Sequence, residues 1–317
     1  MSAASAKSAK TARKGKRGSS PRQARTIDHL VLPVSELSFA RERLTALGFT
    51  VAPDAQHPFG TENCCVYFKD GTFLEPLGIA QRETCETTAL KGNVFTARDQ
   101  VYRFRRGNNG FSALVFSTKD AKADHARFVK TGISAGKKLK FSRQFEDRKG
   151  NRHTMSFRLA FAADLRAPDA FFFTCERVNA PPGGRKAFEK HANGVVALTE
   201  VALSEPNPSD FQYLLEEVVN SREINAHSFG IELRAANASV AVYSPAGMKA
   251  WYGDERCGHG RGVKLRAATF AVADLEATRE VFKSNGVDFR EIAGRLVVAP
   301  ATGQGAIFAF EPLGTAR

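Results

Sequence analysis

The sequence predicts an α+β protein in which four βαβββ units pair into two domains behind a disordered basic N-terminal tail. Three observations lead to this fold class. Residues 27–79 follow the order strand, helix, strand, strand, strand. The spacing of apolar residues and glycine in that unit recurs further along the chain, and a Gly/Pro-rich joint at 181–184 divides the repeats. The predicted parts are a tail at 1–26 and domains at 27–180 and 190–314.

The first unit opens with a strand at 27–32, where β-branched residues and leucines surround His29. Ser35 fits the N-cap of the following helix, and Gly48 fits its left-handed stop. The apolar residues of this helix recur at helical spacing, at Leu37, Ala40, Leu44 and Leu47. The remaining strand candidates are 49–51, 64–68 and 72–79.

Three of the predicted helices share one spacing. Leu37, Leu44 and Gly48 stand at offsets of 0, 7 and 11, and the same offsets return in two other sets, Ala121, Phe128 and Gly132, and Leu275, Phe282 and Gly286. A more diverged third unit has a strand at 198–203 and Pro208 in the first helical turn. The later units end in strands at 171–175, 239–243 and 306–310. A single unit would leave one sheet face bare, so pairing two units closes a cavity.

Length, charge and cysteine content limit the class of protein. The 317 residues suit about two domains, and no apolar run approaches the ~20 residues of a membrane helix. Residues 1–26 hold eight Lys and Arg and no acid, which leaves +5 of the net charge of +13 on the rest. The tail is therefore predicted to be disordered, as a solubilising extension. Weak nucleic-acid or anionic-lipid binding and organellar targeting stay open as alternatives. Five cysteines without a CxxC pair (64, 65, 85, 175 and 257) indicate a reduced, cytoplasmic chain.

Four short stretches resemble a known family. They are DHLVL at 28–32, LGF at 47–49, GTEN at 60–63 and FLE at 73–75. Together they resemble the glyoxalase-like proteins of the vicinal oxygen chelate superfamily, which includes glyoxalase I, extradiol dioxygenases and bleomycin-resistance proteins. The resemblance implies the paired βαβββ fold and, in family members that pair units between chains, a homodimer. It does not specify the reaction, because this fold hosts many chemistries.

His29 and Glu75 are the candidate metal ligands. Each interrupts an apolar strand face, where an imidazole or a carboxylate needs a partner. A divalent zinc, iron, manganese, cobalt or nickel ion would suit a mixed nitrogen and oxygen set. The resemblance implies metal ligands on the first and fourth strands of two paired units, and His29 and Glu75 occupy two of those positions. The alternative, equally open, is that they bond to each other or line a metal-free cavity.

The other units depart from that pattern. Ala113 stands at the first-strand position of the second unit, and the matching fourth-strand position falls near Glu176, a candidate ligand or catalytic group. A full four-ligand site is therefore not expected. In the second domain, Glu200 and Ala267 replace the histidines that extradiol dioxygenases use, with Glu311 as the nearest fourth-strand acid. Ring-cleaving iron chemistry is not expected there.

Further candidates lie outside the strands of the first unit. His57, on a loop, is a candidate acid or base. A basic hairpin with its turn near 147–151 places His153 and Arg158 as candidate substrate-binding residues, with Asn63 as a third. The predicted function is binding of a small anionic carbonyl or hydroxy compound, with metal-dependent lyase or isomerase chemistry. The alternative is a non-catalytic binding or sequestering protein without a metal.

Overall fold

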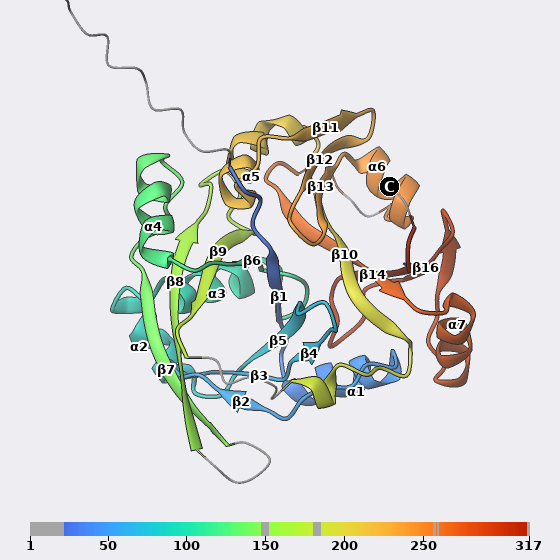
Figure 1. Ribbon diagram of the computed structural model, residues 1–317, viewed down its shortest axis with the longest axis horizontal. Coiled ribbons are helices and arrows are strands. Elements are labelled where there is room, and N and C mark those ends of the chain that lie inside the picture. Colours follow the sequence, from blue (N-terminus) through green and yellow to red (C-terminus); the bar gives the residue numbers. More distant parts are fainter. Residues whose placement is uncertain (1–21, 147–151, 180–184, 256–257, 259, 316–317) are drawn as a thin grey trace, which may run out of the picture.

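Two curved β-sheets lie side by side in the computed structural model, with helices between and around them (Figure 1). The structure describes residues 22–146, 152–179, 185–255, 258 and 260–315. The first sheet belongs to the predicted first and second units, and the second sheet to the third and fourth units. The predicted α+β fold of four paired units is therefore confirmed.

The first sheet has nine strands within the described residues. They are β1 (Ile27–Pro33), β2 (Ala55–Gln56), β3 (Thr61–Asn63), β4 (Val66–Tyr67), β5 (Phe73–Ile79), β6 (Ala113–Ser117), β7 (Leu139–Glu146), β8 (Arg152–Ala162) and β9 (Phe171–Arg177). Their spatial order is β2-β3-β5-β1-β6-β9-β8-β7, and β4 pairs with β5.

The second sheet repeats this plan with eight described strands. They are β10 (Val195–Ser204), β11 (Ile224–His227), β12 (Gly230–Arg234), β13 (Ser239–Tyr243), β14 (Lys264–Val272), β15 (Arg290–Ile292), β16 (Arg295–Val298) and β17 (Ile307–Pro312). Their order is β11-β12-β13-β10-β14-β17-β16-β15.

Strand pairing shows how two units join in each sheet. The first and last strands of a unit are parallel neighbours, as in β1 with β5 and β6 with β9. The two units then meet through their first strands, which pair antiparallel, β1 with β6. The second sheet pairs β10 with β13, β14 with β17 and β10 with β14 in the same three ways. This arrangement curves each sheet around a hollow, and it fixes which residues of the two units face each other.

The described helices are α1 (Leu37–Ala46), α2 (Arg82–Leu90), α3 (Val94–Arg106), α4 (Ala121–Lys130), α5 (Gln212–Val219), α6 (Pro245–Tyr252) and α7 (Leu275–Ser284), with 3-10 turns η1 (Lys186–Phe188) and η2 (Pro208–Phe211). Three of the helices, α1, α4 and α7, lie where the spacing of 0, 7 and 11 predicted them. Gly48 follows α1 with φ of 81°, a conformation that glycine adopts at little cost. Two predictions of detail are wrong. The residue capping α1 is Glu36 rather than Ser35, and residues 49–51 form no strand, because the chain is still turning out of α1.

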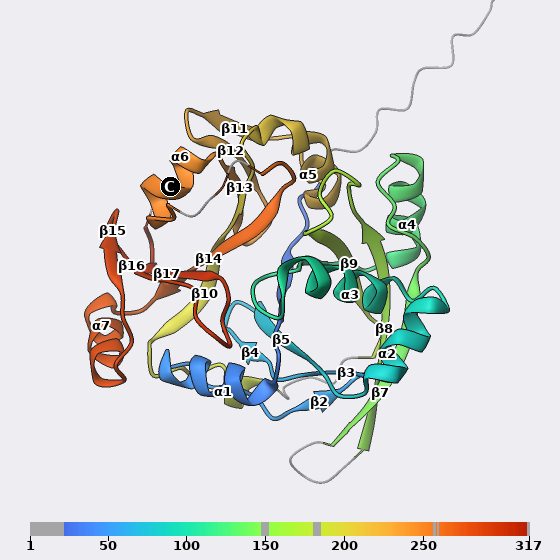
Figure 2. The same cartoon turned by 180° about the vertical axis from the view of Figure 1, so that it is seen from behind.

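Apolar residues form one large core between the sheets and a smaller one inside each hollow. The large core joins the helix-facing sides of both sheets, where Phe49 contacts Phe270 and Phe111 stacks on Phe308. Inside the first hollow, Phe95 of α3 packs on the sheet, and Figure 2 shows α3 lying within its curve. In the second hollow, Met248 and Tyr252 of α6 pack in the corresponding way.

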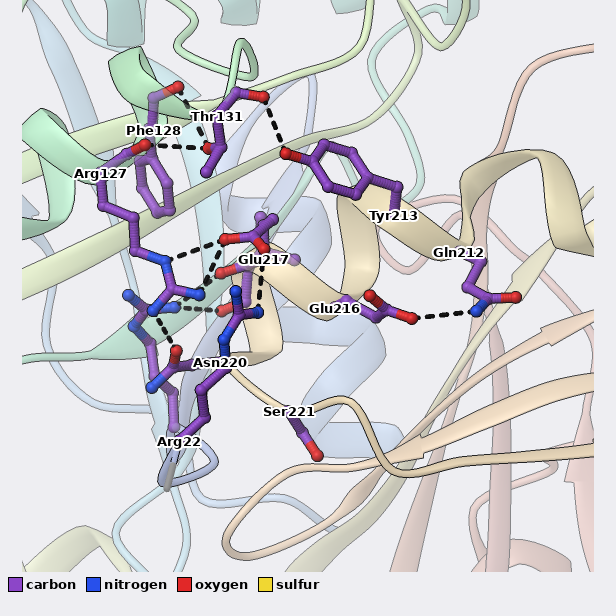
Figure 3. Close-up of polar contacts among 12 residues, drawn as sticks. Arg22, Arg127, Phe128, Thr131, Gln212, Tyr213, Glu216, Glu217, Asn220 and Ser221 are labelled. Carbon is purple, nitrogen blue, oxygen red and sulfur yellow. Dashed lines mark hydrogen bonds and ion pairs between the residues drawn. The ribbon is translucent and has the colours of Figure 1, made fainter. Parts of the chain in front are cut away.

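The end of the predicted tail is anchored to the fold. Arg22 and Arg127 both pair with the buried carboxylate of Glu217 on α5, at 2.9 and 2.8 Å (Figure 3). Arg25 donates to the main-chain oxygens of Glu217 and Val218 at the end of that helix, each at 2.9 Å. A cation at a helix C-terminus is favourable because unpaired carbonyls point there. Residues 22–26 are therefore not part of a disordered tail, which corrects the predicted boundary at 26.

The linker after the first sheet also folds back on it. His191 accepts a hydrogen bond from the Thr50 amide at 3.0 Å, and the Asn193 side chain donates to the Leu47 carbonyl at 2.7 Å. None of the described helices combines the length and apolar character that a membrane crossing requires. The predictions for residues 1–21, for the turn at 147–151 and for Cys257 lie outside the described residues.

Candidate active site

A cavity lies in the hollow of the first sheet, between the sheet and α3. Its volume is about 50 Å³, room for roughly four water molecules at the usual allowance of ~10–15 Å³ each. Four of the predicted site residues line it, namely His29, His57, Asn63 and Glu75. The structure therefore brings together residues from strands and a loop of the first unit.

His29 and Glu75 meet because β1 and β5 are parallel neighbours. His29 is opposite Phe73 and Val31 is opposite Glu75, so alternation turns both polar side chains into the cavity. His29 Nε2 lies 3.2 Å from Glu75 Oε2, and the His29 ring stacks on Phe73. Both side chains are buried, with exposed fractions of 5% and 6%.

A tight loop brings His57 to the same carboxylate. Gly60 has φ of 92°, and a Cβ there would lie 2.5 Å from the Gln81 carbonyl, so this turn requires glycine. His57 Nδ1 lies 2.9 Å from the Thr61 hydroxyl, and Nε2 lies 3.7 Å from Glu75 Oε1. Asn63 on β3 donates to that same oxygen at 2.6 Å.

Asp28 extends this set away from the cavity. His29 Nδ1 donates to Asp28 Oδ2 at 2.7 Å, and Arg177 makes two bonds of 2.6 Å to the Asp28 carboxylate. Neighbouring residues of a regular strand point to opposite faces, but the pairing of β1 with β6 is irregular between Ile27 and His29. Such an irregularity re-aims a side chain. A continuous chain of ionic groups thus runs from Arg177 through Asp28 and His29 to Glu75.

Burial and pairing set different protonation states along this chain. Burial alone would raise the pKa of Asp28, but Arg177 and His29 hold it well below its usual range. Burial opposes the charge on His29 as well, yet its bonds to Asp28 and Glu75 raise its pKa. The pKa of Glu75 falls to about 2 because His29, His57 and Asn63 outweigh burial. His29 and Glu75 are therefore an imidazolium and carboxylate pair.

His57 is neutral in the same surroundings. Burial lowers its pKa to about 4, and the charges of Arg143 and His29 act in the same direction against the attraction of Glu75. Burial also raises the pKa of the two cavity thiols, Cys65 and Cys175, to about 12. Those thiols stay protonated near neutral pH, so they do not act as nucleophiles.

Three other predicted site residues lie elsewhere. Glu176 and Arg158 face away from the cavity, pair with each other at 2.8 Å, and Glu176 also accepts from the Ala121 amide at the start of α4. His153 lies further along the hairpin strand β8, outside the cavity lining. The prediction that Glu176 shares a site with His29 is therefore wrong, because Glu176 caps a helix on the other face of the sheet.

Strand register identifies the residues that correspond to His29 and Glu75 in the second unit. His29 is opposite Phe73 in the first unit, and Ala113 is opposite Phe171 in the second. The residue matching Glu75 is then Phe173, two positions after Phe171, rather than Glu176. An alanine and a phenylalanine thus stand where a symmetric site would have its second pair of polar groups.

These residues do not fit a resident metal centre of the glyoxalase I kind. The methyl group of Ala113 and the ring of Phe173 supply no donor, and that ring meets His29 edge-on at 5.8 Å between centroids. Within the described ranges, no three His, Cys, Asp or Glu side chains stand where they could share one ion. His29 and Glu75 pair with each other, at 3.2 Å between Nε2 and Oε2.

The second sheet has a different polar cluster at the equivalent place. Glu200 takes the position of His29, and it bonds to the hydroxyls of Tyr243 and Tyr252. Glu311 lies two positions beyond the equivalent of Glu75 and pairs with Arg295 at 3.0 Å. In the fourth unit the position equivalent to Glu75 is occupied by Ala309, whose methyl group offers no ligand atom.

Sequence reasoning missed several residues of the cavity. Asp28 was missed because regular strand alternation would place its side chain on the other face of the sheet from His29. Arg143 on β7 and Arg185 before η1 also line the cavity, as does Arg177. For Arg143 a signal existed, since Phe141 and Arg143 alternate in register with Phe157 and Met155 of β8. That pattern places Arg143 on the inner face and Arg158 on the outer one.

Comparison with known proteins supports this picture of the fold. A family model described as a glyoxalase-like domain matches residues 27–219. No curated protein sequence matches the chain. A hypothetical protein from Staphylococcus aureus has a similar structure, with a TM-score of 0.62, 15% identity, and coverage of 91% of this chain and 99% of that one.

Two further solved structures are similar over most of the chain. A triple mutant of 4-hydroxymandelate synthase from Streptomyces coelicolor has a TM-score of 0.60 and 14% identity, with 93% of this chain and 94% of that one covered. An Mn(II)-bound glyoxalase from Novosphingobium aromaticivorans has a TM-score of 0.49 and 12% identity, with 91% and 82% covered. At these identities the likeness concerns the fold alone.

Proposed function

Because this chain belongs to the family of glyoxalase-like domains, we propose that the first-sheet cavity binds a small anionic carbonyl or hydroxy compound and moves a proton within it. The reaction class is that of an isomerase or a lyase. The observation that carries the proposal is the buried His29–Glu75 ion pair beside a neutral His57. Titratable groups held in different protonation states in one cavity are typical of acid–base sites.

His57 is the proton acceptor in this proposal. The proposal assigns the ring proton to Nδ1, 2.9 Å from the Thr61 hydroxyl, which leaves Nε2, 3.7 Å from Glu75 Oε1, unprotonated. Nε2 takes a proton from a ligand carbon next to a carbonyl or hydroxyl group, and it returns the proton to a neighbouring atom. The Glu75 carboxylate, 3.7 Å away, stabilises the imidazolium that forms in between.

The other residues hold Glu75 in position. His29 and Asn63 each bond to one of its oxygens, at 3.2 and 2.6 Å. Asp28 and Arg177 in turn hold the His29 ring. These contacts cover most of the carboxylate, so Glu75 acts as a fixed negative charge rather than as a mobile base.

Exchange of solvent deuterium into carbon measures proton transfer directly, whatever the product of the reaction. Three anionic carbonyl compounds, pyruvate, hydroxypyruvate and oxaloacetate, are incubated with the full chain in deuterated buffer, and label at carbon is followed by NMR above the rate of a protein-free blank. We expect label in at least one compound with wild type. His57→Gln and Glu75→Gln should each lose about 100-fold or more of the rate. His153→Ala is the matched control, because this histidine lies outside the cavity lining.

Two results would contradict the proposal. Equal exchange rates in wild type and His57→Gln would show that His57 is not the base. Binding of these compounds, seen as thermal stabilisation, without any exchange would favour the non-catalytic alternative.

A metal-dependent reaction makes a different prediction. Elemental analysis of purified protein, with His29→Ala and Glu75→Ala beside it, should show no stoichiometric metal if the side chains act alone. About one zinc, iron, manganese, cobalt or nickel per chain, lost in both variants, would show instead that His29 and Glu75 bind a metal.

A further inference from the structure

Two arginines from distant parts of the chain line the same cavity. Arg143 comes from β7 in the hairpin, and Arg185 directly precedes η1 in the linker to the second sheet. The Arg185 guanidinium lies over the rings of Tyr67 and Phe73, 4.5 and 4.9 Å from their centroids. Arg143 lies 5.6 Å from the ring centroid of Phe157. Burial raises the pKa of Tyr67, and the positive charges of both arginines act against that rise.

These two charges are not neutralised by the protein residues described. The cavity carboxylates are already engaged, Asp28 by Arg177 and Glu75 by His29. Arg143 and Arg185 form no ion pair with an acidic side chain in the described part of the chain, and Arg143 Nη1 is buried without a hydrogen-bond acceptor. A buried donor of this kind costs free energy until an acceptor reaches it.

We propose that Arg143 and Arg185 clamp the charged group of a small organic dianion, either a dicarboxylate or a phosphate monoester. The proposal rests on the proposed function for the reacting end of the ligand, and it names the ligand class. Two unpaired guanidinium groups balance two negative charges, and their planar forks match carboxylate and phosphate oxygens. The aromatic rings beneath them exclude water and hold the forks in place. A cavity of about 50 Å³ restricts the ligand to a small molecule.

The hairpin supplies a matched control for this clamp. Arg158 lies on β8, the strand paired to β7, but on the outer face of the sheet, where it bonds to Glu176 at 2.8 Å. Removing Arg158 changes the net charge of the protein as much as removing Arg143 does. If anions are attracted only by the overall positive charge of the chain, both variants should lose the same affinity. If the clamp binds them specifically, only the Arg143 variant should lose affinity.

Isothermal titration of the full chain tests the clamp with malonate, inorganic phosphate and acetate as probes. We expect malonate or phosphate to bind wild type more tightly than acetate. Arg143→Gln and Arg185→Gln should each weaken that binding about 10- to 100-fold, while Arg158→Gln binds as wild type does. Arg143→Lys keeps the charge and loses the fork, so intermediate affinity is expected. The tighter of the two dianions identifies the head group.

The outcomes separate the clamp from the proposed function. Unchanged affinity in Arg143→Gln and Arg185→Gln, or no binding of any probe to wild type, overturns the clamp. His57→Gln should keep its affinity for the dianion and lose deuterium exchange. If the clamp variants lose affinity while His57→Gln still exchanges, the clamp stands and the assigned base is wrong. Circular dichroism of each variant shows whether it is folded.

Discussion

Lowering the pH from 7 to 5 is expected to destabilise the wild-type protein by about 2 kcal/mol more than a His57→Asn variant. His57 is neutral in the folded cavity, where burial lowers its pKa from 6.5 to about 4. In the unfolded chain the same imidazole is exposed to water and becomes protonated as the pH falls below 6.5. The unfolded state then binds the proton and is stabilised by it, while the folded state does not.

The size of the effect follows from the two pKa values. At pH 5 the unfolded state gains a factor of about 30 from protonation relative to the folded state, which is about 2 kcal/mol at 25 °C. At pH 7 the same term is about 0.2 kcal/mol. The contribution of His57 to stability is thus present above pH 6.5 and is lost as the pH falls from 6.5 to 4.

The other two cavity groups have different pH windows. The raised pKa of His29 favours the folded state below pH 6.5, and that contribution is lost as the pH rises through the folded pKa. The lowered pKa of Glu75 favours the folded state above 4.5, and that contribution is lost between 4.5 and about 2. Both contributions are present in wild type and in His57→Asn, so the difference between the two proteins isolates His57.

Urea unfolding followed by far-ultraviolet circular dichroism at both pH values measures this difference. His153→Asn serves as the control histidine, since it lies outside the cavity lining, and it should behave as wild type does. If wild type and His57→Asn lose the same stability to within about 0.5 kcal/mol, the imidazole is not held neutral and the proposed base is wrong.

Two further ionic groups give predictions for stability. Asp28→Asn should lower the free energy of unfolding by about 3–5 kcal/mol, because it leaves Arg177 without its bidentate partner; adding Arg177→Gln should restore part of the loss in a double-mutant cycle, and full additivity would contradict the pairing. Glu217→Gln should cost about 2 kcal/mol, because Arg22 and Arg127 lose a charged acceptor (Figure 3). Urea unfolding checks this value, and an unchanged midpoint would show that the anchor of the N-terminal segment adds no stability.

Local patterns in the sequence determined the repeated fold. The offsets of 0, 7 and 11 marked α1, α4 and α7. One face of each helix must be apolar to cover a sheet, and a glycine follows the end of each helix. Alternation along β1 and β5 placed His29 and Glu75 on inner faces. The helices α2 and α3 were not foreseen, because they lie in a connection between units and outside the repeat.

Only the tertiary structure decided which other residues join His29 and Glu75. The strand register of the second unit places Phe173, and not Glu176, at the position equivalent to Glu75, and spacing along the chain does not reveal register. The irregularity in β1 turns Asp28 toward His29, and the folds of the hairpin and the linker bring Arg143 and Arg185 to one cavity. The sequence by itself determined the four units and the two polar groups at their inner faces. The composition of the cavity depended on contacts between segments far apart in the chain, which local periodicity does not encode.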